Sequence, residues 1–324
     1  MRRPLLLLLK AAISILLLYM SLRSVDLAAL AERLSRLDIG WIAIALALLN
    51  AQVVLLAIRW RSIVTECGPR LAFAAALRIT FIAAFFSQVL PSTIGGDAAR
   101  IWLLARRGGG WASATYSVLL DRIAGICALA LIVIACLPWT LNLVHNSIAR
   151  SFLLLIGGGA VAGACVFMAI GVLRWRLFDQ WALTRHLVKV SRVGWRLCAS
   201  RRSIISIGAI SLSVHLLTIV VAWCFVQAVS ASASFALLLF LVPPVILIAT
   251  VPVSIAGWGV REGGMIIAFA YAGLAQSDGL IVSVLLGLTA FAIGTIGGIA
   301  WIMGDARLPA APPNSGASSF ADRA

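Results

Sequence analysis

The sequence predicts an all-α protein that crosses a membrane several times and is built as an inverted repeat of helix, re-entrant hairpin and helix. Hydrophobic residues make up 62% of the 324 residues and charged residues only 11%, with a mean hydropathy of +1.07. Soluble proteins carry about 25% charged residues. Apolar stretches of roughly 18 to 20 residues, enough to cross the hydrocarbon core, recur along the chain. A motif that contains Pro and Gly also occurs twice.

The apolar stretches define the expected domain. They cover residues 5–22, 39–58, 71–90, 112–138, 151–173, 203–229, 235–250, 263–276 and 280–303. The first resembles a signal peptide, but Lys10 interrupts it and no small-residue cleavage site follows, so we expect a retained helix. We therefore expect residues 1–304 to form a single transmembrane domain. The tail, residues 305–324, is rich in Pro, Ser and Ala and is expected to be disordered.

The longest connection, residues 174–202, carries eight basic residues and one acid. Loops rich in Arg and Lys stay in the cytoplasm, so this basic loop should be cytoplasmic, and counting helices from it places both termini there too. Apolar residues alternate with the basic ones, which favours a helix lying on an anionic leaflet; the alternative is a solvated basic loop. The formal charge of +15 is explained in this way, and we do not expect a nucleic-acid partner.

The repeated motif reads PSTIGGDAAR at residues 91–100 and PVSIAGWGVR at residues 252–261, and the two copies align without gaps. Such breaks are tolerated in lipid only where protein or a wet cavity shields the backbone. Pro91 and Pro252 are expected to break the helices. Gly95, Gly96, Gly257 and Gly259 are expected to belong to a substrate site, where exposed backbone amides add positive potential.

Paired broken segments in two halves of a membrane protein indicate an inverted repeat. We assign repeat A to residues 39–138 and repeat B to residues 203–303, with re-entrant hairpins at 71–106 and 235–276. The alternative is that residues 71–90, which are long enough to span, cross the membrane and leave no first hairpin.

Six ionisable residues lie within or beside the apolar stretches, and each would cost about 2.5 to 3.5 kcal/mol if unpaired at mid-bilayer. They are Asp97, Arg100, Asp121, Arg122, Arg261 and Glu262. One interpretation is a closed salt-bridge network that only fixes helix register. The other is a substrate site in which the arginines bind a phosphate and the acids hold them or exchange protons. Thr93 and Ser254 belong to this candidate site or cap the freed backbone.

The sequence contains no pattern typical of covalent chemistry. Its three histidines are isolated, its six cysteines lack metal-ligand spacing, and no GxSxG surrounds a serine. We therefore expect no enzyme activity, no cofactor and no metal.

Three segments, LPSTIGGDAAR, SVLLDRIAG and PVSIAGWGVREGG, resemble signatures of the lysylphosphatidylglycerol synthase transmembrane-region family, and the resemblance extends over about residues 5–303. It implies translocation of a lipid across the bacterial cytoplasmic (inner) membrane, with the motif residues lining the path. The resemblance does not extend to the soluble transferase domain of the full-length synthases, so we expect an aminoacylated substrate to require a lipid-modifying enzyme encoded separately.

The leading hypothesis is a flippase for a phosphate-bearing lipid, which could be aminoacylated, hopanoid or polyprenyl in kind. Its partners would be membrane lipids with an anionic headgroup. Two alternatives belong to other classes. One is a secondary transporter for a small soluble anion, and the other is a membrane scaffold for an envelope-lipid enzyme that transports nothing itself.

Overall fold

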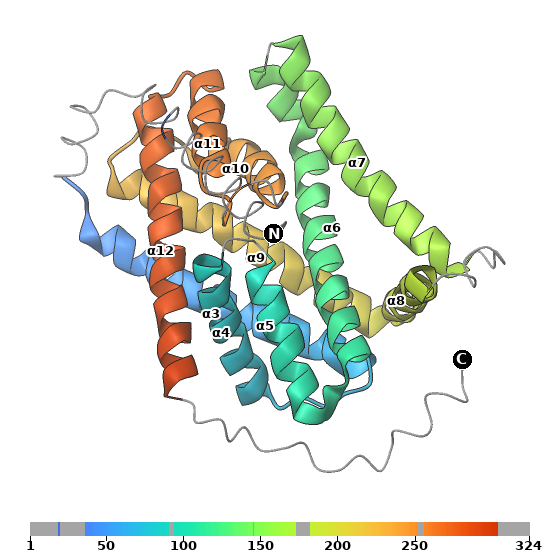
Figure 1. Ribbon diagram of the computed structural model, residues 1–324. Coiled ribbons are helices and arrows are strands. Elements are labelled where there is room, and N and C mark those ends of the chain that lie inside the picture. Colours follow the sequence, from blue (N-terminus) through green and yellow to red (C-terminus); the bar gives the residue numbers. More distant parts are fainter. Residues whose placement is uncertain are drawn as a thin grey trace, which may run out of the picture.

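The computed structural model describes residue 19 and residues 36–90, 94–144, 146–172, 182–251, 254 and 256–303. These residues form helices joined by short connections, and no β-strand occurs among them (Figure 1). Five described helices are long and apolar enough to cross a bilayer: α3 (Ile39–Glu66), α6 (Trp111–Leu143), α7 (Ser147–Val172, with its candidate span at Leu153–Val172), α9 (Arg201–Ala228) and α12 (Gln276–Ile302). The all-α class is confirmed, and the helices are compatible with a multi-pass membrane protein.

Shorter elements lie between the long helices. They are α4 (Phe73–Val89), α5 (Gly95–Leu104), the π-helical turn η1 (Ala105–Gly109), α8 (Ala182–Ala199), α10 (Phe235–Ala249) and α11 (Val260–Tyr271). The order is therefore a long helix, two short helices and a long helix, first as α3 to α6 and again as α9 to α12. Within each set the two short helices pack against each other.

Local sequence explains where several helices begin. Asp38 caps α3 by accepting a hydrogen bond from the Gly40 amide at 2.8 Å. The Ser200 and Ser234 hydroxyls accept hydrogen bonds from backbone amides in the first turns of α9 and α10. Side-chain oxygens at this position satisfy amides that have no partner inside the helix.

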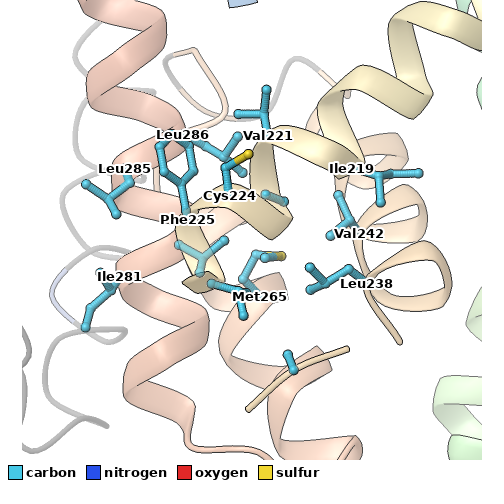
Figure 2. Packing of buried hydrophobic residues seen from close by; sticks show 14 of the residues in the cluster. Ile219, Val221, Cys224, Phe225, Leu238, Val242, Met265, Ile281, Leu285 and Leu286 are labelled. Atoms are coloured by element: carbon cyan, nitrogen blue, oxygen red, sulfur yellow. The ribbon is translucent and has the colours of Figure 1, made fainter. Parts of the chain in front are cut away.

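Each set of helices buries its own apolar core. The first core joins α3, α4, α5 and α6 around Trp60, Ile79 and Leu103. The second core is built mainly from α9, α10, α11 and α12, where Phe225, Leu238 and Met265 are fully buried. Figure 2 shows Met265 and Leu238 side by side in this cluster, with Phe225 above them.

The two sets pack mainly through three pairs of helices, and α6 also contacts α9 and α3 contacts α12. The first helices, α3 and α9, lie against each other, while α4 packs on α12 and α10 packs on α6. By their order, α4 of the first set corresponds to α10 of the second, and α6 corresponds to α12. The contact of α4 with α12 and that of α10 with α6 are therefore equivalent, and the packing pattern is the same seen from either set. In Figure 1 the pair α10 and α11 lies toward the top of the molecule and the pair α4 and α5 toward the bottom.

Two basic stretches are helical. Helix α3 continues to Glu66, eight residues beyond the expected apolar stretch 39–58, so Arg59 lies within a helix. The described part of the basic loop, 182–199, is helix α8, as the alternation of apolar and basic residues favoured. The first apolar stretch (apart from Tyr19), residues 173–181, the C-terminal tail and the motif residues Pro91, Thr93 and Pro252 lie outside the described residues.

Candidate functional site: a charged cavity

A cavity of about 460 Å³ lies among helices α3, α4, α5, α6 and α9, and Thr250 at the end of α10 completes it. Its charged lining residues are Arg59, Asp97, Arg100, Asp121 and Arg122. The other walls are mostly apolar and include Val53, Leu56, Ala83, Ala84, Ile94, Ile126, Leu129 and Val214. A volume in this range is typical of small-molecule sites, which occupy roughly 300 to 1,000 Å³.

Asp121, on α6, is the centre of the charged lining. It is 2% exposed. Its Oδ1 accepts a hydrogen bond from Arg59 Nε and its Oδ2 accepts one from Arg100 Nη1, both at 2.8 Å. Arg59 also donates through Nη1 to Ser211 Oγ on α9 at 3.1 Å. One carboxylate thus joins three helices from the first half of the chain, and the Arg59 bond extends the network to the second half.

The two arginines that share Asp121 are not saturated by it. A guanidinium has five N–H donors. Among the described residues, Arg100 donates one hydrogen bond and Arg59 donates two. The Arg100 guanidinium also lies 4.8 Å from the Trp60 ring centroid, a cation–π contact. Both groups therefore keep donors that a further anionic acceptor could use.

A second ion pair borders the cavity. Arg122 on α6 donates to both carboxylate oxygens of Asp97 on α5, at 2.8 and 3.0 Å. The Arg122 side chain is 48% exposed and that of Asp97 14%, whereas the side chains around Asp121 are nearly buried. The described lining residues therefore hold three arginines against two carboxylates, an excess of one positive charge if the neighbouring His215 is neutral.

Glycines allow the charged helix α5 to approach α4 closely. A Cβ on Gly96 would lie 2.5 Å from the carbonyl oxygen of Ala83, and one on Gly95 would lie 2.6 Å from that of Phe86. Within the described residues no side-chain cap is present at the start of α5, and Ile94, Gly96 and Asp97 all line the cavity. The positive end of the α5 dipole is therefore beside the arginines.

Arg261 and Glu262, at the start of α11, form a separate cluster and are not among the cavity-lining residues. Arg261 Nη2 donates to Glu262 Oε1 at 2.7 Å, and Arg261 Nε also donates to Ser283 Oγ on α12 at 3.0 Å. Glu262 is fully buried, and its other oxygen accepts from the Gly259 amide at 2.5 Å. This arginine is thus already neutralised by a carboxylate of its own helix.

The break before α11 needs glycine. Gly257 and Gly259 have φ angles of +81° and +86°, a region that other residues rarely adopt. Ser254, in the same break, is 1% exposed, and its hydroxyl has no hydrogen-bond partner within the described part of the chain.

The structure brings together four of the six predicted ionisable residues, Asp97, Arg100, Asp121 and Arg122, and places Arg261 and Glu262 elsewhere. Arg59, Ser211 and the cavity position of His215 were missed by sequence reasoning. The Nε2 atom of His215 lies 2.9 Å from the Gly125 carbonyl oxygen. The sequence does indicate that Arg59 lies in a helix, because the apolar residues Ile63 and Val64 continue the helical pattern beyond residue 59.

Helices long enough to cross a bilayer, with a buried arginine and carboxylate cluster beside a cavity, define a polytopic α-helical membrane protein. The chain belongs to the lysylphosphatidylglycerol synthase transmembrane-region family, whose model matches residues 7–298. The resemblance stated from the three motifs is thereby confirmed. A comparison with curated proteins gives no significant match.

Proposed function

We propose that this protein is a lipid flippase of the cytoplasmic membrane, which binds a phosphate-bearing headgroup in the charged cavity. The observation that carries the proposal is the sharing of Asp121 by Arg59 and Arg100, which leaves one more cation than acids in a mostly buried site. An anionic headgroup supplies the missing charge and accepts the unused guanidinium donors. The protein would move its substrate without modifying it.

The composition of the cavity wall favours a lipid over a small soluble anion. The charges gather on α3, α5 and α6, whereas Val53, Leu56, Ile126 and Leu129 make other parts of the wall apolar. A soluble anion gains nothing from apolar walls, because it would exchange water for them. A lipid brings a charged head and apolar chains and matches both parts.

We further propose that the two sets of helices are inverted repeats with re-entrant hairpins α4–α5 and α10–α11. The exchangeable packing pattern and the separate cores support this interpretation. The ion pairs support it too. In the gapless motif alignment Arg100 corresponds to Arg261. Arg100 bonds Asp121 on α6 and Arg261 bonds Ser283 on α12, 21 and 22 residues further along the chain.

An exchange of charges tests the repeat. Glu262→Gln alone leaves Arg261 without its acid and should cost about 3 to 5 kcal/mol. Adding Ser283→Asp returns a carboxylate at the position that corresponds to Asp121, and we expect the double variant to recover at least half of the lost stability. A double variant no more stable than Glu262→Gln would contradict the correspondence.

The transport proposal is tested in vesicles that contain the purified protein. A phospholipid with a fluorescent acyl chain is bleached from outside by a membrane-impermeant reductant, so lipid in the inner leaflet loses fluorescence only if it is moved outward. We expect complete bleaching with the wild type. Arg100→Gln removes a charge-assisted bond and should slow the movement about 10- to 100-fold, while Arg59 still pairs with Asp121.

The control variant is Arg70→Gln, which removes an exposed arginine that does not line the cavity. It should transport as the wild type does. Uptake of radiolabelled inorganic phosphate into the same vesicles distinguishes the soluble-anion alternative. Phosphate uptake without lipid movement would overturn the flippase proposal, as would wild-type lipid movement in a folded Arg100→Gln variant.

A further inference from the structure

Helix α8 carries four cations and no acid. Arg185, Lys189, Arg192 and Arg196 are spaced by four, three and four residues and are all exposed. At 3.6 residues per turn this spacing places them along one side of the helix. We call these four residues the basic stripe. Like charges so close together destabilise a helix unless something compensates them.

The other side of α8 is fixed to the body of the protein. Val190, Val193 and Leu197 are buried in a cluster with residues of α3, α6 and α9. Two side chains anchor it to the end of α7: Ser191 Oγ donates to the Phe167 carbonyl at 2.5 Å and Trp195 Nε1 donates to the Met168 carbonyl at 2.7 Å. The stripe is therefore held in place and does not need ordering when it binds a ligand.

Two more cations extend the basic surface. Arg201 and Arg202 are exposed in the first turn of α9, where the positive end of the helix dipole disfavours cations. They are therefore not placed there to stabilise α9. Of the described acids, Glu66 lies beside this surface and accepts a hydrogen bond from Ser203 Oγ at 3.4 Å, and one acid cannot balance six cations.

The position of α8 identifies the adjacent surface. It follows α7 and precedes α9, both candidate membrane spans, and is separated from α9 by Ser200 alone. Figure 1 shows α8 beside the end of α7. Leu187 and Trp195 on α8 are 37% and 43% exposed. Exposed apolar groups on a helix that also carries a row of cations are typical of helices that lie in the headgroup region of a bilayer.

We propose that the basic stripe binds the anionic headgroups of the leaflet on which α8 lies, while Leu187 and Trp195 enter its apolar boundary. The ligand class is a phospholipid of net negative charge, bound as several molecules along the helix. A polybasic surface gains about fivefold in affinity for each Lys or Arg at an anionic membrane. This surface is separate from the cavity, and the proposal holds whether or not the cavity transports a lipid.

Energy transfer from a probe on α8 to labelled lipids tests the proposal. Cys198 is exposed on α8, and a donor dye is attached to it after the other five cysteines are replaced by Ala. The protein is placed in phosphatidylcholine bilayers with a trace of acyl-labelled acceptor, either phosphatidylglycerol or phosphatidylcholine. We expect stronger transfer to the phosphatidylglycerol acceptor, and the excess should vanish in 1 M NaCl, where the Debye length is about 3 Å.

A pair of double variants locates the effect. The double variant Lys189→Gln with Arg192→Gln removes two cations and should lower the enrichment of phosphatidylglycerol around α8 by up to about 25-fold. Arg70→Gln with Arg106→Gln removes the same number of exposed charges outside the stripe and should leave the excess unchanged. Equal transfer to both lipids in the wild type, an excess that resists salt, or an excess retained in the stripe variant would each overturn the proposal.

Discussion

Removing the carboxylate of Asp121 tests the charge arrangement most directly. In Asp121→Asn, Arg59 and Arg100 lose their acid, and their side chains are only 5% and 8% exposed. Breaking a buried pair by removing one partner costs about 3 to 5 kcal/mol. The change keeps size and shape, so packing contributes little. At roughly 2 °C per kcal/mol, the unfolding midpoint should fall by about 6 to 10 °C.

The same cavity offers a matched control. Asp97→Asn is the same chemical change, but its partner Arg122 is 48% exposed. A pair with one half-exposed partner contributes less than a fully buried one, so the unfolding midpoint should fall by clearly less than in Asp121→Asn. Both midpoints can be followed in detergent with a maleimide dye that fluoresces on reaction with buried thiols, since Cys136 and Cys224 are buried. Equal shifts in the two variants would refute the buried-cluster reasoning.

Three further predictions follow from packing, thiol chemistry and topology. Gly297→Ala places a Cβ against the α4 backbone and should cost about 1 to 3 kcal/mol, whereas Gly163→Ala, which meets no atom within 4 Å, should not lower the unfolding midpoint. Burial raises the pKa of the Cys67 thiol to about 12. Since only the thiolate reacts, the rate of its alkylation in the folded protein should keep rising above about pH 10, where the rate for an ordinary thiol levels off. Cysteines introduced at Arg106 and Ala275 should react with impermeant maleimides from opposite faces of the membrane, and labelling from the same face would contradict the inverted topology.

The order of helices could be predicted because each depends on local information. Apolar length predicted the spans, and Pro and Gly at residues 91–96 and 252–259 predicted the breaks between α4 and α5 and between α10 and α11. Helix ends were harder. The segment of α3 from Arg59 to Glu66 carries three charged residues, which ended the expected apolar stretch at residue 58, although Trp60, Ile63 and Val64 follow helical spacing.

The composition of the site depended on tertiary packing and was only partly predictable. A charge within an apolar stretch indicates that a partner must exist, which identified Asp121 and Arg100. It does not say which partner, and Arg59, 62 residues before Asp121, is joined to it only by the crossing of α3 and α6. Conversely, Arg261 pairs with Glu262, the next residue. The sequence alone could not show whether Arg261 is neutralised by this acid or left available to bind an anion.

The difference between the two arginine clusters indicates which of them an anion should bind first. Arg261 is matched one to one by Glu262 and further satisfied by Ser283, so a bound anion would have to compete with a carboxylate already in place. Asp121 is divided between two arginines, and neither obtains both of its oxygens. An incoming phosphate there adds bonds without breaking any. Because a buried excess charge is costly and its neutralisation is correspondingly favourable, the cluster at Asp121 is where an anionic guest should bind first, and the closed cluster at Arg261 would have to open before it could accept the same guest.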